Sequence, residues 1–383
     1  MVWPRDRRHS GTRAGAGVIG FVLAAGALAI DEHDSGRDLA TYVRLALAKN
    51  PAVRAARNDV AAAREAQRLA VSLPDPSLSA GYFISEVETR VGPQQAKVGA
   101  SQKLPWPGKL VRRREAAAEG LRVAREKQSA VEAEVFWRLR AEYSGLYAAG
   151  RAIAVNNENL KLLEHIESVL LSQYATAEVS QASVLKIQVE RAKLGDRIES
   201  LKSRERTHAE EIRALVGGDT SLVIQTPARI ESLTVDTSGL GGAAKQVNPS
   251  VLMSLHKARE AAARARLARQ GWLPDFMVMT DYIITRESHS SMVSSAEDGK
   301  DPWAVGLSVT LPLWVGKKSS EIRSAESVAA SQRARWEHAE NVAAATAVSL
   351  TEDLADARRR IHLLEDVLVP KARQTLSLVQ EAY

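Results

Sequence analysis

The chain has 383 residues, carries a formal net charge of +6 and contains no cysteine. The lack of cysteine excludes disulfides, thiolate catalysis, cysteine zinc sites and a cysteine-linked lipid anchor. Aromatic residues make up only 5% of the sequence, whereas alanine and arginine are abundant. This composition is typical of long helices with small-residue contacts rather than of a thick aromatic core.

Residues 1–29 have the three parts of a secretory signal peptide. Four arginines (Arg5, Arg7, Arg8 and Arg13) precede an apolar run over 15–29, and Ala27-Leu28-Ala29 supplies a cleavage site. The alternative is a membrane anchor helix, for which the run is short, since a span needs about 20 residues. Removal of 1–29 lowers the formal charge from +6 to +3, so a nucleic-acid partner is not expected.

An internal repeat organises the rest of the chain. Three short motifs recur in the same order at offsets of 198, 200 and 207 residues, and ordered matches at a near-constant offset indicate duplication. The pairs are Asn50-Pro51-Ala52-Val53 with Asn248-Pro249-Ser250-Val251, Leu73-Pro74-Asp75-Pro76 with Leu273-Pro274-Asp275-Phe276, and Leu104-Pro105 with Leu311-Pro312. We therefore predict a first repeat over 30–218, a linker over 219–247 and a second repeat over 248–383.

Each repeat reads as helix, strand, loop, strand, helix. Residues 51–72 have the helical period without an internal breaker, and Pro74 and Pro76 end it. Residues 77–85 and 96–104 then alternate apolar with small or polar side chains, as do 276–285 and 303–311 in the second repeat. The loop over 287–302 is polar.

These strands are 9 to 11 residues long, the length that crosses a bilayer when tilted. For a single strand, the alternative is a soluble sheet with one buried face. Four such strands after a signal peptide favour membrane strands. Four strands are too few to close a membrane barrel, and open edges in lipid leave backbone groups unpaired, so the chain is expected to oligomerise.

Proline and glycine mark each change from strand to helix. Proline cannot donate ladder hydrogen bonds and cannot occupy a helix interior, so it separates the two periodicities. The predicted strand-to-helix hinges are Pro105, Pro107, Gly108, Pro312 and Gly316.

A long helix is predicted from Gly108 to about Tyr174. An apolar stripe with heptad-like spacing supports it, formed by Phe136, Leu139, Tyr143, Leu146, Ile153, Leu160, Leu163, Ile166 and Leu170. A turn is expected next, with Ser180 as the cap of a returning helix that ends at Gly217-Gly218.

The motifs of both copies resemble the outer-membrane efflux protein (TolC-like) family. They are "LATYVRLALAKNPAVRAAR", "QKLPWPGKL", "YATAEVSQASVLKIQVE", "NPSVLMSLHKAREAA" and "LSVTLPLW". The resemblance covers the chain from about Asp38, and the Pro-Trp-Pro-Gly-Lys hinge is similar to the heavy-metal cation efflux branch. It implies a mainly α fold with a β-barrel part: long antiparallel helical hairpins form a periplasmic α-barrel, and four transmembrane strands per chain contribute to a trimeric twelve-stranded barrel.

The resemblance also implies function and partners. The expected function is an outer-membrane channel subunit of a tripartite efflux system, a passive exit duct for metal cations or small toxic compounds. The partners would be two further copies, a periplasmic adaptor, an inner-membrane pump and outer-membrane lipid. The turn that would contact the adaptor comprises Tyr174, Ala175, Thr176, Ala177, Glu178, Val179 and Ser180. Many relatives have glycine in this turn, so Ala177 is a departure that could alter its geometry.

The second repeat is expected to lack its last helix. The final "SLVQEAY" aligns with "LLSQYA" of the first repeat, where the turn precedes the returning helix. About 45 residues would be missing by comparison with the first copy, and the gating residues of the family cannot be assigned.

No catalytic or cofactor site is expected. Eight histidines are scattered, and neither a zinc-binding HExxH nor a phosphate-binding GxxxxGK motif occurs. If the apolar strand face meets lipid, Met277, Met279 and Asp281 face the lumen. Thioethers bind soft cations such as Cu(I), and the alternative is adaptable packing, so no metal site is assigned. A periplasmic coiled-coil adaptor or a scaffold remains the alternative to a channel.

Overall fold

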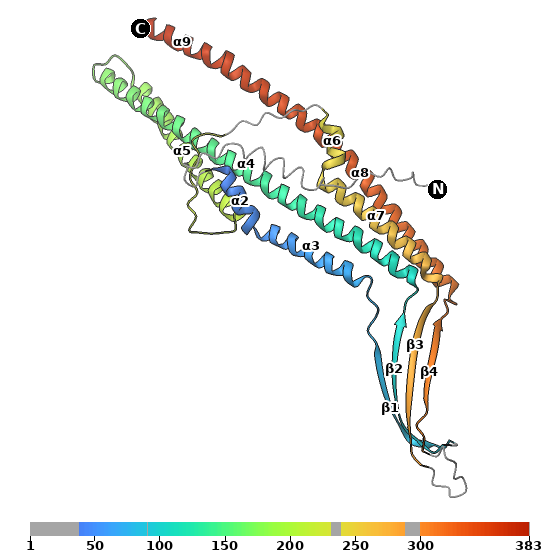
Figure 1. Ribbon diagram of the computed structural model, residues 1–383. Helices are drawn as coiled ribbons and strands as arrows, with labels where there is room; N and C mark the ends of the chain where they lie inside the picture. Colours follow the sequence, from blue (N-terminus) through green and yellow to red (C-terminus); the bar gives the residue numbers. More distant parts are fainter. Residues whose placement is uncertain (1–37, 90, 231–238, 288–298, 383) are drawn as a thin grey trace. The chain divides into compact units, whose positions relative to one another are not determined.

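The computed structural model describes residues 38–89, 91–230, 239–287 and 299–382 (Figure 1). The predicted signal peptide lies outside these residues, as do parts of the predicted linker and of the loop over 287–302. The described residues form two compact units, one from the described parts of 38–59 and 127–239 and the other from the described parts of 60–126 and 240–382. The repeat boundaries predicted from the sequence stay a prediction.

The first unit is helical. It contains α2 (Leu39–Lys49), the beginning of α3 (Pro51–Leu69), most of α4 (Pro107–Ala175) and α5 (Gln181–Leu215). Its core gathers apolar side chains from all four helices, which include Tyr42, Val53, Leu139, Leu146 and Ile212. The rings of Tyr42 and Tyr143 lie 6.2 Å apart at a tilted angle. The stripe predicted along 136–170 is confirmed, because each of its residues is buried or half-buried.

Asn50 joins the start of one helix to the end of another. Its side-chain oxygen accepts from the backbone N–H of Ala52 at 2.8 Å, which caps α3, and its amide donates to the carbonyl of Leu215 at 2.9 Å. Only 6% of Asn50 is exposed, so both ends of the side-chain amide satisfy backbone groups that would otherwise be buried without partners.

Helix α5 ends at two glycines, as predicted. Gly217 and Gly218 have φ values of 108° and 77°, and their N–H groups donate to the carbonyls of Ala214 and Arg213. This is the Schellman pattern, which favours glycine in the left-handed conformation. A Cβ on Gly217 would come within 2.9 Å of the Cβ of Lys49, so the lack of space also favours glycine at this position.

The second unit combines helices with the sheet. Its helices are the remainder of α3 and α4, α6 (Leu240–Val247), α7 (Pro249–Arg269), η1 (Gln270–Trp272), α8 (Val315–His362), the π-helical η2 (Leu363–Leu368) and α9 (Val369–Ala382). Helix α7 packs along α8, and α6 contacts both. Asn248 caps α7 by accepting from the N–H of Ser250 at 2.9 Å, so both copies of the Asn-Pro motif begin a helix.

The sheet is antiparallel, with the order β1-β2-β3-β4. Its strands are β1 (Ser77–Val87), β2 (Gln94–Leu104), β3 (Asp275–Thr285) and β4 (Trp303–Thr310), and Figure 1 shows them side by side. The hairpins β1–β2 and β3–β4 come from different ends of the sequence and are joined by pairing between β2 and β3. The four predicted strands are thus confirmed in position, and β4 ends one residue earlier than expected.

Two further details differ from the predictions. Pro107 is the first residue of α4 rather than the residue before it, a position where its missing N–H has no helical partner to lose. Ser180 precedes α5 as expected but its side chain makes no capping hydrogen bond, because its hydroxyl lies 3.2 Å from that of Ser183.

Among the described residues, no helix has both the length and the apolar character that crossing a membrane requires.

Candidate functional site

The sheet has one apolar face, which is exposed in the single chain. Its side chains alternate along the strands, and the largest exposures include Ile84 at 96%, Trp303 at 71% and Leu307 at 66%. Strand pairing places these positions in rows that cross the sheet, such as Leu78, Ala100, Thr280 and Val305. The alternation predicted from the sequence therefore forms a continuous apolar surface.

The opposite face carries mainly small, polar and charged side chains, together with the larger apolar side chains of Met277, Met279 and Ile283. Met277, Met279 and Asp281 lie on this face of β3, beside Lys97 and Ser101 of β2. The ammonium of Lys97 lies 3.0 Å from the carboxylate of Asp281. The sequence analysis predicted that the two methionines and Asp281 share a face, and the strand register brings them together.

Glycines on the polar face make room for longer neighbours. A Cβ on Gly99 would lie 2.5 Å from the Oδ1 of Asp281 and 2.8 Å from the hydroxyl of Ser79. A Cβ on Gly306 would lie 2.9 Å from the side chain of Met279. Among the described residues, no three His, Asp or Glu side chains gather where they could hold a metal ion.

The junction between sheet and helices contains the predicted hinge residues. Pro105 lies between β2 and α4, Pro107 begins α4, and Pro312 lies between β4 and α8. Gly108 and Gly316 are the second residues of α4 and α8. A Cβ on Gly108 would come within 3.0 Å of the side chain of Gln270, whereas one on Gly316 would meet nothing within 4 Å.

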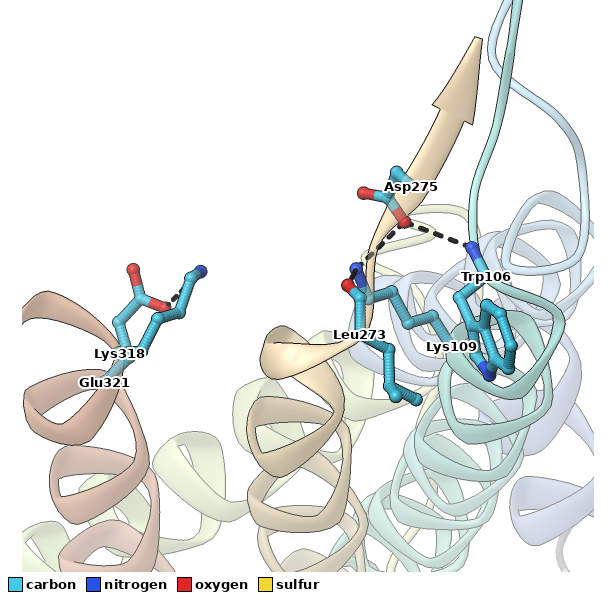
Figure 2. A network of polar contacts seen from close by, with 6 residues as sticks. All are labelled: Trp106, Lys109, Leu273, Asp275, Lys318 and Glu321. Atoms are coloured by element: carbon cyan, nitrogen blue, oxygen red, sulfur yellow. Dashed lines mark hydrogen bonds and ion pairs between the residues drawn. The ribbon is translucent and has the colours of Figure 1, made fainter. Parts of the chain in front are cut away.

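Asp275 is the centre of a polar network at this junction (Figure 2). Its Oδ1 accepts from the backbone N–H of Trp106 at 3.0 Å and from the ammonium of Lys109 at 2.8 Å. The same ammonium donates to the carbonyl of Leu273 at 2.9 Å. The Lys109 and Asp275 side chains are 12% and 21% exposed, so the network joins residues more than 160 positions apart in a place that water reaches poorly.

The sequence singled out Asp275 only as part of a repeated motif and did not predict its contacts. The recurrence of Leu-Pro-Asp before a strand, together with a lysine after each hinge, was the available signal. The rings of Trp106 and Phe276, 6.2 Å apart, lie beside the network.

Helices α4 and α7 are joined by a Glu119–His256 contact, in which the carboxylate lies 2.7 Å from the Nδ1 atom. Burial alone would raise the pKa of Glu119. The hydrogen bond with His256 and the charges of Arg122 and Arg259 outweigh burial, so the pKa lies below its ordinary value. A lowered pKa in the folded state means that this contribution to stability exists above the unfolded-state pKa and is lost as the pH falls through the folded-state pKa.

The turn between α4 and α5 keeps a left-handed residue although it lacks glycine. Ala177 has a φ of 60°. Its N–H donates to the carbonyl of Tyr174 at 3.0 Å, and the N–H of Glu178 donates to that of Gln173 at 2.9 Å. This is again the Schellman pattern, with alanine in the position that usually holds glycine. The substitution therefore leaves the turn geometry in place and adds steric strain.

Polar contacts also hold the two helices together near this turn. Glu167 of α4 is only 7% exposed and accepts from Gln188 at 2.9 Å, while Arg191 lies 2.8 Å from its other oxygen. The turn residues themselves, 174–180, are all exposed except the half-buried Val179. The turn is thus a firmly supported and accessible end of a helical hairpin.

Comparison with known proteins shows a match over part of the sequence and a likeness over most of the fold. Residues 240–383 match the family model described as outer membrane efflux protein. No curated protein sequence matches the chain.

Several solved structures share the fold. A membrane protein from Pseudomonas aeruginosa is 18% identical, with a TM-score of 0.76 over 90% of this chain and 83% of that one. CusC is 19% identical, with a TM-score of 0.68 over 90% and 82%. The outer membrane protein VceC from Vibrio cholerae is 19% identical, with a TM-score of 0.65 over 90% and 82%.

The resemblance to the outer-membrane efflux protein family is therefore confirmed over residues 240–383, where the family model matches. The solved structures show that most of the chain shares their fold. The expected fold class is mainly α with a β-barrel part to which each chain contributes four strands. It is confirmed in that the described chain is mainly helical with one four-stranded antiparallel sheet and shares the fold of known channels.

The polar network of Asp275 predicts a measurable coupling. Lys109→Met, Asp275→Asn and the double variant form a double-mutant cycle, in which each single change leaves the other residue without its ion-pair partner. We expect a coupling free energy of about 1–3 kcal/mol from thermal unfolding of the purified protein, because hydrogen bonds to charged groups in sheltered places have this value. The matched control is the pair Lys318–Glu321, 2.8 Å apart but more exposed, for which about 0.5 kcal/mol or less is expected. Equal coupling for both pairs would contradict the role given to Asp275.

The left-handed alanine predicts that Ala177→Gly stabilises the turn. Relief of about 1–2 kcal/mol of steric cost exceeds the entropy cost of about 0.4–1 kcal/mol that glycine adds. Hydrogen exchange at the Glu178 amide should slow about threefold to fivefold. Ala175→Gly, at the last residue of α4, is the control and should speed exchange instead. Faster exchange in Ala177→Gly would show that the turn is not strained.

Proposed function

We propose that the chain is one subunit of an outer-membrane channel that serves a tripartite efflux system as a passive exit duct. The observation that carries the proposal is the two-faced sheet: an exposed apolar surface on one side, and small and charged side chains such as Ser101 and Lys97 on the other. Strands of this kind suit a wall between lipid and water. The family match over 240–383 supports the same conclusion.

Oligomerisation follows from the edges of the sheet. In the described chain, β1 and β4 each pair with one neighbour only, and unpaired backbone groups in lipid cost several kcal/mol each. Copies of the chain would satisfy them by closing a barrel, and three copies give the twelve strands expected from the resemblance. The helices would then continue the duct through the periplasm.

The polar face of the sheet would line the duct in this arrangement. Met277, Met279 and Asp281 are proposed to face the lumen, where the Lys97–Asp281 pair supplies both signs of charge. The proposed cargo is metal cations, as the Pro-Trp-Pro-Gly-Lys hinge suggests, or small toxic compounds. The duct itself would be passive, with energy and selectivity supplied by an inner-membrane pump.

The α4–α5 turn is the proposed contact for a periplasmic adaptor. It is exposed over Tyr174–Ser180, and the Glu167 contacts support the helices behind it. The hinge residues Pro105, Pro107, Gly108, Pro312 and Gly316 are proposed to hold the change of direction between barrel and helices. The alternative, that the chain is itself an adaptor or scaffold, is not favoured by the family match.

Neighbouring positions of β4 provide the test. Leu307 lies on the apolar face and Ser308 on the polar face of the same strand. An arginine in lipid at mid-strand costs about 2–4 kcal/mol, so Leu307→Arg should remove oligomers from the outer-membrane fraction. Ser308→Arg should insert normally and lower single-channel conductance in planar bilayers. If both variants insert equally well, the apolar face does not lie in lipid, and the proposal fails.

A further inference from the structure

The two hairpins share one register. Every β1–β2 pair from Ser77↔Ser101 to Tyr82↔Ala96 has an equivalent in β3–β4, from Met277↔Ser308 to Tyr282↔Trp303. The first strand is offset by 200 residues and the second by 207 in all six pairs. Residues 96–103 of β2 therefore have defined counterparts in β4, and residues 277–285 of β3 have defined counterparts in β1.

The pairing of β2 with β3, here called the seam between the hairpins, predicts a second pairing of the same kind between β4 and another β1. In that seam Ser101 faces Met279 and Leu104 faces Phe276. Applying the same offsets, Ser308 of β4 would face Ser79 of a second β1, and Leu311 would face Pro76. The free edges of the sheet are β4 and β1, which are the strands that this operation requires.

The helix that follows each strand shows the same equivalence. Lys109 is the third residue of α4, after Gly108, and Lys317 is the third residue of α8, after Gly316. Asp275 is the first residue of β3, and its counterpart Asp75 lies two residues before β1. Lys109 and Asp275 form an ion pair, whereas Asp75 and Lys317 are exposed, and no ion pair within 4.0 Å is seen for either among the described residues. The charge of Lys317 acts on Glu321, four residues further along α8.

In the proposed barrel, β4 of one copy meets β1 of the next. For that contact we infer a specific register, with Ser308 opposite Ser79, and an ion pair between Lys317 and Asp75 of the next copy. The inference rests on the proposed channel and specifies the contact that closes it. The seam between copies then repeats the Lys109–Asp275 contact that joins the two hairpins within a copy.

The surroundings of Lys317 agree with this assignment. Its neighbour Lys318 is 2.8 Å from Glu321 and its side chain runs beside Gly271 of the same chain, so Lys318 is occupied. Gly316 has open space where its counterpart Gly108 lies against Gln270. A neighbouring copy is the occupant that the repeat predicts for this space.

The two seams are not identical on the polar face. Lys97 and Asp281, which pair within the chain, correspond to Ala304 and Gly81. The seam between copies therefore has small side chains on this face, and the hinge ion pair is the charged contact that remains.

Cysteine cross-linking tests the register, because the chain contains no cysteine of its own. Directly opposed residues have Cβ atoms about 4.5–5.5 Å apart, close to the spacing that a disulfide needs. Within one copy, β1 and β4 are three strand spacings apart, about 14 Å, so the engineered pair can link only between copies. The double variant Ser79→Cys with Ser308→Cys should form disulfide-linked dimers and trimers in outer membranes.

The control is Ser79→Cys with Thr310→Cys, in which the second cysteine is two residues out of register on the same face. Efficient linking of this control without linking of the first pair would overturn the inference. If the oligomer inserts and conducts but neither pair links, the inference also fails while the proposed channel stands. If no membrane-inserted oligomer forms even without substitutions, the proposed function fails, and the inference fails with it.

Charge exchange tests the ion pair separately. Asp75→Lys and Lys317→Asp should each lower the temperature at which the oligomer dissociates in detergent, and the double variant should restore it. Asp75→Lys combined with Lys318→Asp is the control and should not restore it. Restoration by Lys318→Asp instead, or no effect of either single change, would overturn the assignment of Lys317.

Discussion

The other elements of the described chain leave the apolar face of the sheet exposed. The other features of the molecule follow from this constraint. Ile84, Trp303 and Leu307 are each exposed by more than 60%, and burial of such side chains contributes about 1.5–3 kcal/mol apiece. In water this surface would drive association. In lipid it is already solvated, and the remaining requirement is that the edge strands find partners.

The junction with the helices determines how that sheet is held. Proline follows closely after β2 and β4. Asp275, the first residue of β3, then binds Trp106 and Lys109, which lie just after β2. One carboxylate thus connects both repeats at the point where strand geometry changes to helix geometry. The second hinge has the same proline, glycine and lysine, but among the described residues Lys317 has no carboxylate partner equivalent to Asp275. The repeat is therefore a guide to assembly as well as to folding.

Local pattern predicted most of the fold. The period of two in the strands, the apolar stripe from Phe136 to Leu170 and the glycines after α5 each specify a local conformation, and the structure confirms them. The contact between Lys109 and Asp275 could not be predicted in the same way, because it depends on how two hairpins pair across about 170 residues of sequence. The same holds for the amide of Asn50 on the carbonyl of Leu215.

Two other features show what local sequence patterns do not specify. Ser180 occupies the predicted cap position but bonds to Ser183 instead, since a hydroxyl has several partners of similar value within reach. The π-helical segment Leu363–Leu368 precedes Pro370. A proline inside a helix removes one backbone donor and often disturbs the hydrogen-bond ladder nearby, but the sequence does not specify which local adjustment results.

The most direct measurement is the accessibility of β4 residues in a membrane. Single cysteines at each position from 303 to 310 can carry a spin label, and collision with lipid-soluble oxygen can be compared with collision with a water-soluble nickel chelate. Oxygen should dominate at Trp303, Val305, Leu307 and Val309, and the chelate at the other four positions, 304, 306, 308 and 310. Chelate access at all eight positions, or no alternation along the strand, would contradict a sheet that separates lipid from a water-filled duct.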